Sequence, residues 1–404
     1  MQRVTPEQVG LCSQRLARIG PWMRDWVDSG RLPGMVALVA RRGQVAYCDA
    51  YGMRDVAAGL PMGVDTVFRI YSMTKPLTSV AIMMLYEEGR FQLDDPIARH
   101  LPMFADMRVF SSGNAEHYQT VAALSPITFR QLLTHTSGLT YGFLEATPVD
   151  ALYRQHGVDF QSAERPLQEM TDALAALPLL NHPGAEWNYS VSTDVLGALV
   201  EVLSGQPFAQ FMRERILTPL ALVDTDFHVR EENHARFAAN YTRSREGGLK
   251  QIDSASDSRY LKPRVLSSGG GGLVSTASDY FRFLCFMRNL GELDGVRLLG
   301  RKTVQFMTRN HLRGDMADMG QPRFSESSYS GIGFGLGFSV MLDPAKAEIL
   351  GSPGEYAWGG AASTAFWIDP LEDMAVVLLT QLLPSSTYPL RRQLRVLSYQ
   401  AIID

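Results

Sequence analysis

Lysine, cysteine and long apolar runs are scarce in this chain of 404 residues. The three cysteines, Cys12, Cys48 and Cys285, lie far apart and form no CxxC pair, which argues against a disulfide framework and favours a reducing compartment. No stretch of about 18 uninterrupted apolar residues occurs, so no membrane span is expected. The first eight residues also lack the apolar run of a signal peptide. We therefore expect a cytoplasmic protein.

The chain also lacks a large excess of positive or negative charge. The chain has 38 Lys and Arg residues against 42 Asp and Glu, a net charge of −4, and only five of the cations are lysines. No basic block occurs, so neither a nucleic acid nor a membrane is expected as a partner. None of the eight histidines stands in an HExxH or similar spacing, so we expect no metal and no other cofactor. The absence of G-x-S-x-G excludes the α/β-hydrolase nucleophile elbow.

Apolar runs near both ends of the chain predict β-hairpins. Residues 34–40 and 45–48 flank a short polar turn, and residues 364–368 and 374–379 flank a turn rich in Asp and Pro. Helical periodicity precedes the first hairpin and follows the second, at residues 13–31 and 388–402. The two ends of the chain are therefore expected to build one sheet together.

The middle of the chain has a different pattern. Helical periodicity recurs there with no strand expected between the segments, which are 76–90, 128–134, 166–177, 192–205, 207–215 and 278–290. We predict an α/β (α+β) fold with an antiparallel sheet from both chain termini, flanked by helices, and an inserted mainly helical region. The predicted α/β domain comprises residues 1–71 and 291–404, and the helical domain residues 72–290. The active site is expected at their interface.

The segment Ser72-Met73-Thr74-Lys75-Pro76 places a hydroxyl and an amine three residues apart. Residues with this spacing share one face of a helix, so the two groups can touch. Proline is tolerated only in a first helical turn, which places Ser72 at or just before a helix N-terminus. A neutral Lys75 amine can then take the Ser72 proton. By itself the motif also fits a capping serine beside a solvated lysine.

A second segment, residues 183–191, ends in Tyr189-Ser190-Val191 and precedes the apolar helical run 195–203. Tyr189 is therefore expected just ahead of a helix N-terminus, where its phenol can shuttle a proton between a nucleophile and a leaving group. A tyrosine that merely packs at the start of a helix would look the same in sequence.

A third segment is Trp358-Gly359-Gly360-Ala361, on a predicted late strand. Glycines inside a strand often mark a place where a ligand or another backbone approaches closely. The backbone N–H groups of such an edge can bind an oxyanion. A simple β-bulge is the alternative interpretation.

Taken together, these segments resemble the three ordered motifs of serine β-lactamases and penicillin-binding proteins. The resemblance is closest to the β-lactamase-like carboxylesterases, often called family VIII esterases. Two further segments are similar to the same superfamily, residues 132–139 (LLTHTSGL) and 268–276 (SGGGGLVST). The resemblance covers about residues 10 to 400.

The resemblance implies a role for each motif residue. Ser72 would be the nucleophile and Lys75 the base that activates it. Tyr189 would protonate the leaving alkoxide and help to activate the deacylating water. The backbone N–H groups of Ser72 and Ala361 would form the oxyanion hole. Which of Lys75 and Tyr189 acts as the base in each step is left open.

Two departures from the family pattern bear on the substrate. Trp358 stands where the K-T-G motif has its lysine, which removes a charge-assisted contact to a substrate carboxylate and supplies an apolar wall beside Gly359 and Gly360. Val191 stands where the second motif has asparagine. These four residues are the predicted substrate-binding residues, and both departures favour neutral, apolar esters.

We therefore predict a carboxylesterase that hydrolyses small, largely apolar esters through an acyl-serine intermediate, with a small-molecule ester as its partner. The alternatives are a β-lactamase, a D-Ala peptidase, an amide-oligomer hydrolase or an acyltransferase of the same superfamily. A non-catalytic binding protein on this scaffold is a third possibility.

Overall fold

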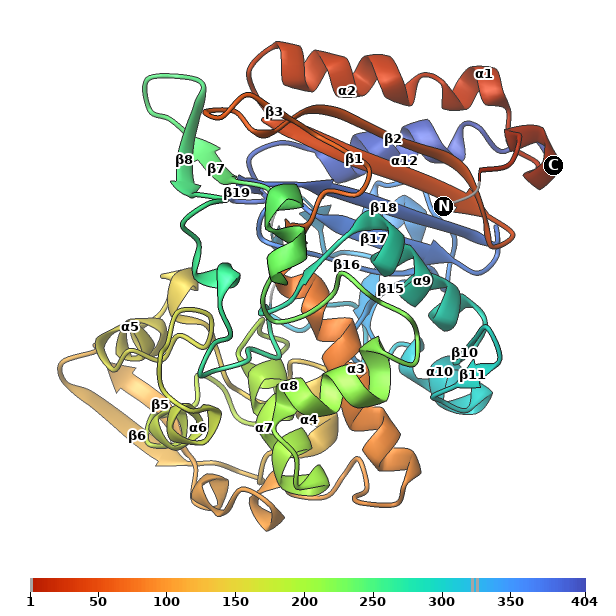
Figure 1. Cartoon of the computed structure of the whole chain (residues 1–404). Helices are drawn as coiled ribbons and strands as arrows, with labels where there is room; N and C mark the ends of the chain where they lie inside the picture. Colours follow the sequence, from red (N-terminus) through yellow and green to blue (C-terminus); the bar gives the residue numbers. More distant parts are fainter. Residues whose placement is uncertain (1–2, 321–322, 325–326) are drawn as a thin grey trace.

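The computed structural model of the protein describes residues 3–320, 323–324 and 327–404. Within these residues, the largest sheet has eight strands in the order β14-β15-β16-β17-β18-β1-β2-β3, and neighbouring strands are antiparallel. Strands from the two ends of the chain lie side by side in it (Figure 1). The strands are Ile332–Phe334, Ser339–Met341, Tyr356–Gly359, Ala365–Asp369, Met374–Thr380, Gly34–Arg41, Gln44–Asp55 and Leu60–Pro61, in that order.

The first apolar run forms strand β1, and the burial of this strand on both faces explains why polar residues do not alternate in it. Successive side chains of a strand point to opposite faces, and all eight residues of β1 are buried. Val36 and Leu38 belong to a hydrophobic core on one face of the sheet. Met35 and Ala37 belong to a second core on the other face. The sheet is therefore the middle layer between two layers of helices.

One layer consists of helices from the ends of the chain. Apolar side chains of α1 (Ser13–Leu16), α2 (Ile19–Asp28) and α12 (Leu390–Tyr399) fill the second core with Met35 and its neighbours. The first predicted helix is divided in two, and the break falls before Ile19, ahead of the Gly20-Pro21 pair.

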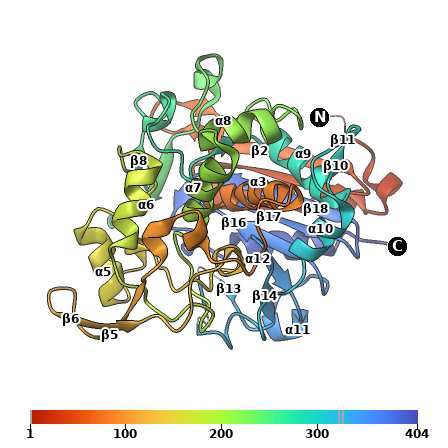
Figure 2. The same ribbon diagram turned by 90° about the horizontal axis from the view of Figure 1, so that it is seen from below.

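The other layer is built around α3 (Thr74–Glu87), which is buried from Thr74 to Leu85. Its buried residues are polar near the start, at Thr74, Lys75, Thr78 and Ser79, and apolar from Val80 to Leu85. Figure 2 shows α3 at the centre of the molecule, beside α7. The other α-helices of the described residues are α4 (Phe129–Leu133), α5 (Pro148–Gln155), α6 (Leu167–Ala175), α7 (Ser192–Ser204), α8 (Phe208–Met212), α9 (Ala277–Arg288), α10 (Arg301–Met307) and α11 (Pro344–Ala347).

The fold class is confirmed, but the expectation of no strands in the middle of the chain is wrong. Two hairpins lie there, β5 (Arg108–Gly113) with β6 (Tyr118–Ala122) and β7 (Asn240–Arg243) with β8 (Leu249–Asp253). Most residues of β5, β6 and β8 are exposed or half-buried, so their sequences lack the apolar alternation that reveals a half-buried strand.

Short strands complete the described structure. They pair as β4 (Phe68–Arg69) with β9 (Val274–Ser275), β10 (Glu292–Leu293) with β11 (Val296–Arg297), β12 (Arg323–Phe324) with β13 (Ser327–Ser328), and β19 (Leu382–Leu383) with β7. Both predicted hairpins at the chain ends are present, as β1–β2 and β17–β18. The domain boundaries stay a prediction, although α9, from the range assigned to the helical domain, packs on β18 and β1. No helix in the described ranges is long and apolar enough to cross a membrane.

Arg69, three residues ahead of the predicted nucleophile, binds residues that lie far away in the sequence. Its fully buried guanidinium donates to the Asp253 carboxylate at 2.7 Å, to the Ala238 carbonyl at 2.5 Å and to the Ser258 hydroxyl at 3.0 Å. Burying an arginine is costly unless its donors are all used. The network therefore fixes β4, and with it the approach to Ser72.

We predict that Arg69→Met lowers the free energy of unfolding by about 3–5 kcal/mol, because the Asp253 carboxylate and the Ala238 carbonyl lose a buried partner. Urea denaturation followed by circular dichroism measures the change. Arg99→Met, which breaks the exposed pair with Asp95, is the control and should cost about 1 kcal/mol or less. Equal losses in the two variants would contradict the prediction.

Candidate active site

The chain turns sharply at the residue before Ser72. Tyr71 has a φ of 44°, in the left-handed region that a bulky side chain rarely adopts. A hydrogen bond of 2.8 Å from the Asn240 side-chain amide to the Tyr71 hydroxyl helps to hold this conformation. Tyr71 to Met73 form a 3-10 turn that leads into α3 at Thr74. Ser72 therefore lies at the N-terminus of the buried helix, as the position of Pro76 predicts.

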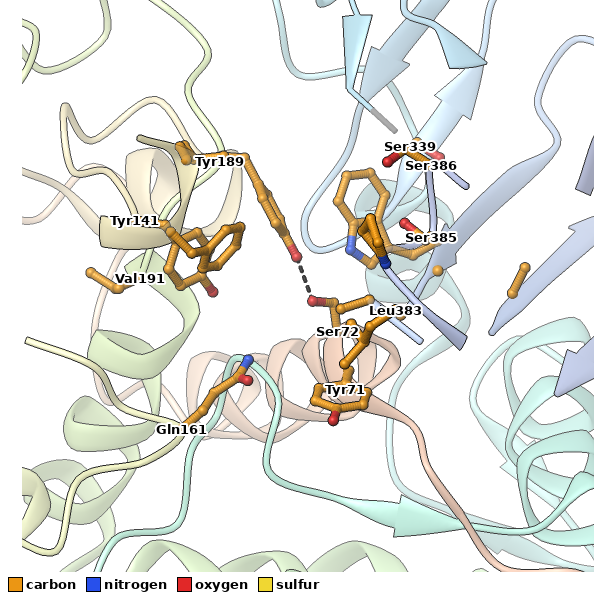
Figure 3. A pocket seen from close by; sticks show the side chains of 18 of the residues that line it. Tyr71, Ser72, Tyr141, Gln161, Tyr189, Val191, Ser339, Leu383, Ser385 and Ser386 are labelled. Atoms are coloured by element: carbon orange, nitrogen blue, oxygen red, sulfur yellow. Dashed lines mark hydrogen bonds between the residues drawn. The ribbon is translucent and has the colours of Figure 1, made fainter. Parts of the chain in front are cut away.

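Ser72, Lys75 and Tyr189 meet at one point. The Tyr189 hydroxyl donates to Ser72 Oγ at 2.6 Å (Figure 3), and Lys75 Nζ donates to the same atom at 3.3 Å. Tyr189 comes from the loop that ends at the start of α7, so the contact joins residues 117 positions apart. The Ser72 oxygen thus has two proton-carrying groups within hydrogen-bond distance.

Lys75 is buried, with 1% of its surface exposed. Besides Ser72 Oγ, its Nζ donates to the Gly270 carbonyl at 2.7 Å and to the Tyr141 hydroxyl at 2.9 Å. The amine also lies 4.6 Å from the centre of the Tyr189 ring, whose electron-rich face favours a cation. Within the described ranges, the lysine ion pairs are those of Lys346 and none involves Lys75.

Asp194, in the first turn of α7, holds the turn that supplies the Gly270 carbonyl. Its Oδ1 accepts from the Ser268 hydroxyl at 2.6 Å and from the Gly270 N–H at 2.9 Å. Burial raises the pKa of Asp194, while the nearby Lys75 charge and these two hydrogen bonds oppose the shift. Asp194 thereby aims the Gly270 carbonyl at Lys75 without touching Ser72.

His135 supports the Tyr189 loop. Its carbonyl accepts from the Asn188 N–H at 2.9 Å, and its ring lies 5.1 Å from the Tyr189 ring and within 3.1 Å of the Ser190 hydroxyl. Burial, and then the charge of Lys75, lowers the pKa of His135 well below its usual range, so the ring is neutral at working pH. In the described network His135 contacts the Tyr189 loop and not Ser72.

Glycine at positions 359 and 360 lets neighbouring atoms lie closer than a side chain would permit. A Cβ on Gly360 would lie 2.4 Å from the Ile70 carbonyl oxygen and 2.2 Å from Thr364 Oγ1. A Cβ on Gly359 would lie 2.6 Å from the Arg391 guanidinium carbon, and Arg391 donates to the Gly360 carbonyl at 3.1 Å. The end of β16 can therefore lie against the segment before Ser72 only because position 360 has no side chain.

A cavity of about 1200 Å³ opens over Ser72. Of the predicted site residues, those that line it are Ser72, Tyr189, Val191, Trp358, Gly359, Gly360 and Ala361. Much of the remaining wall is aromatic or aliphatic, including Tyr71, Tyr141, Phe143, Phe160, Tyr329 and Ile332. The Trp358 ring packs 5.5 Å from Tyr189 and 5.2 Å from Phe334. Nowhere in the described ranges do three His, Cys, Asp or Glu side chains gather as metal ligands would.

A tyrosine hydroxyl beside a buried serine and lysine, under a mostly apolar cavity, is the arrangement of a serine acyl-transfer enzyme. The family model described as Beta-lactamase matches residues 19–400. The chain belongs to the β-lactamase family.

Two relatives and one solved structure are similar to this chain over most of its length. The chain is 34% identical to Esterase EstB of Burkholderia gladioli, over 87% of this chain and 86% of that protein. It is 31% identical to Monacolin J acid methylbutanoyltransferase of Aspergillus terreus, over 89% of both. The structure resembles that of EstCE1, a hydrolase with promiscuous acyltransferase activity, with a TM-score of 0.81, 29% identity and coverage of 96% and 99% of the two chains. The predicted resemblance to family VIII esterases is thereby confirmed.

Three groups around Lys75 were not identified in the sequence. Tyr141 lies two residues beyond the LLTHTSGL segment, and a single tyrosine there carries no motif of its own. Asp194 lies just beyond Tyr189-Ser190-Val191, at a position where an acidic residue in a first helical turn is common. The Gly270 carbonyl belongs to the SGGGGLVST segment, which resembles the superfamily but gives its glycines no individual role. A backbone oxygen leaves no residue type to search for.

We predict that Gly360→Ala slows covalent labelling of Ser72 by a fluorophosphonate about a hundredfold. The added methyl group should force Ala361 away from Ser72, and a loss of this size is expected when one oxyanion donor is removed. The measurement is the second-order labelling rate constant, with thermal unfolding recorded in parallel. Gly20→Ala in α2 is the control, since its Cβ meets nothing closer than 3.5 Å. A normal labelling rate in Gly360→Ala would show that the close approach to Ile70 is unimportant for the site.

Proposed function

We propose that the protein is a carboxylesterase that hydrolyses small, largely apolar esters through an acyl-Ser72 intermediate. The observation that carries the proposal is the contact of Ser72 Oγ with both Tyr189 and Lys75 at the floor of the cavity. The likeness to Esterase EstB and to the hydrolase EstCE1 supports this reaction class.

In the proposed reaction, Ser72 Oγ attacks the ester carbonyl carbon and its proton passes to Lys75 or Tyr189. The backbone N–H groups of Ser72 and Ala361 donate to the oxyanion. The C–O bond to the alcohol then breaks, and the leaving alkoxide takes a proton from Tyr189. Water attacks the acyl carbon, gives up a proton to the same groups and releases the carboxylic acid with Ser72 restored.

The cavity wall supports apolar substrates. Trp358 is 9% exposed and packs against two aromatic rings, and Val191 presents only carbon atoms. Neither side chain holds a carboxylate as a lysine would. A β-lactam or a D-Ala peptide, each with a carboxylate, therefore lacks the contact that a lysine at position 358 would make.

Acyl transfer to an alcohol is the second candidate function. The cavity volume of about 1200 Å³ exceeds the usual range for one small ligand, which leaves space for an acceptor beside the acyl group. A methylbutanoyltransferase stands among the relatives at 31% identity. An alcohol that attacks acyl-Ser72 in place of water forms a new ester and needs the same proton transfers.

We also propose a cytoplasmic location. The three cysteines are unpaired, which suits a reducing compartment. A small-molecule ester, rather than a nucleic acid or a membrane, is the proposed partner.

The nucleophile is tested by substitution and labelling. We expect Ser72→Ala to abolish ester cleavage and fluorophosphonate labelling while thermal unfolding is unchanged. Peptide mass spectrometry of the wild type should place the adduct on the peptide that contains Ser72. Ser79→Ala, seven residues later on the same buried helix, is the matched control and should keep its activity. An adduct on any other serine would overturn the assignment.

Substrate class is tested with two kinds of substrate. We expect kcat/KM for p-nitrophenyl esters of C2 to C12 acids to exceed that for a chromogenic cephalosporin by at least about a hundredfold, because Trp358 offers no charge to the cephalosporin carboxylate. A preference for the cephalosporin would replace the esterase assignment by that of a β-lactamase. Adding an alcohol acceptor and measuring the new ester tests the second candidate.

A further inference from the structure

Lys75 needs a partner that serves it in both protonation states. As an ammonium it has three N–H donors and no acceptor, and as a free amine it has two donors and one lone pair. The Gly270 carbonyl, 2.7 Å away, can only accept a hydrogen bond. The side chain of Val191, which stands where the second family motif has asparagine, offers neither donor nor acceptor. A hydroxyl group can do both, and the Tyr141 hydroxyl lies 2.9 Å from Lys75 Nζ.

The Tyr141 hydroxyl keeps its own proton. Burial, and next the negative Asp194, raises the pKa of Tyr141 well above 10, so the phenol is neutral throughout the working pH range. It therefore accepts from the Lys75 ammonium and donates to the Lys75 amine. It does not act as a base, and no contact between its oxygen and Ser72 Oγ is seen in the described network.

The residue before Tyr141 is held by two hydrogen bonds. The Thr140 carbonyl accepts from the Val191 N–H at 3.2 Å, and the Thr140 hydroxyl donates to buried Asp150 at 2.7 Å. The Tyr141 ring packs 4.6 Å from the Phe143 ring and 5.1 Å from the Tyr189 ring. These contacts restrict the hydroxyl to one place beside Lys75, next to Tyr189 in the cavity wall (Figure 3).

Gly270 leaves the space that the hydroxyl needs. A Cβ on Gly270 would lie 2.8 Å from the Tyr141 oxygen and 2.4 Å from Asp194 Oδ2. Contacts this short force one of the groups to move, and Asp194 is fixed by two hydrogen bonds. The glycine turn and Tyr141 therefore fit together around the lysine.

We propose that Tyr141 is a positioning residue that holds Lys75 Nζ beside Ser72 in both the charged and the neutral state of the lysine. The proposal rests on the proposed role of Ser72 as the nucleophile and adds a residue to that site. Of the three contacts of Nζ, the one to Ser72 is the longest, at 3.3 Å. The Tyr141 and Gly270 contacts thus anchor the amine, and the Ser72 contact depends on them.

The test is Tyr141→Phe, which removes one oxygen and leaves the ring. The readout is the rate of fluorophosphonate labelling of Ser72 from pH 5 to 9, in which an Oγ–P bond forms, fluoride leaves and the hydroxyl proton passes to the base. We expect the maximal rate to fall about ten- to hundredfold, the loss expected for a hydrogen bond to a charged group. The rate should fall across this pH range, because the hydroxyl can contact Lys75 in both of its protonation states. With an ester substrate, kcat should fall while KM changes little.

Tyr280→Phe is the matched control. It removes another buried tyrosine hydroxyl, which donates to the Met73 carbonyl at 2.9 Å and has no contact with Lys75. It should lower the thermal stability without moving the pH profile. An unchanged maximal rate and pH profile in Tyr141→Phe, with normal labelling of the wild type, would overturn the positioning role alone. Absence of labelling at Ser72 in the wild type would overturn the proposed function as well.

Discussion

The burial of the Lys75 amine without a carboxylate partner is the constraint around which the site is arranged. Removing an ammonium from water is costly, and in the described ranges no ion pair compensates Lys75. A carbonyl, a phenol, a serine hydroxyl and an aromatic ring face share the charge instead. A carboxylate in direct contact would hold the proton on the lysine. Asp194 instead accepts from the Gly270 N–H, which orients the Gly270 carbonyl, and it forms no ion pair with Lys75 in the described ranges.

Each partner of this amine comes from a different part of the chain, so the site depends on tertiary packing. The helix that carries Ser72 and Lys75 is buried along most of its length, and Arg69 fixes the strand just before it. The Gly359-Gly360 edge arrives from the sheet, and the Tyr189 loop arrives from the helical layer. The geometry of the site is therefore a consequence of how the sheet and the helical layer pack on α3.

The sequence predicts those parts of the structure that depend on local spacing or on apolar periodicity. Ser72 and Lys75 are three residues apart on a helix whose start is marked by Pro76, and the strands buried on both faces are continuous apolar runs. The hairpins β5–β6 and β7–β8 escaped prediction because exposed strands need no apolar alternation. Tyr141 escaped because its role depends on a contact across 66 positions, which no local pattern records.

The pairing of the first long strand with one of the last has a consequence for biosynthesis. Met35 of β1 pairs with Thr380 of β18, and Cys12 donates its N–H to the Ala401 carbonyl at 2.7 Å. A nascent chain has completed the β1–β2 hairpin long before β18 leaves the ribosome, so one edge of β1 stays open during most of translation. Such late closure over a long loop is slow and leaves apolar surface exposed in the meantime. The same proximity of the two ends makes residues 12 and 401 a natural place to join the chain in a circularly permuted variant.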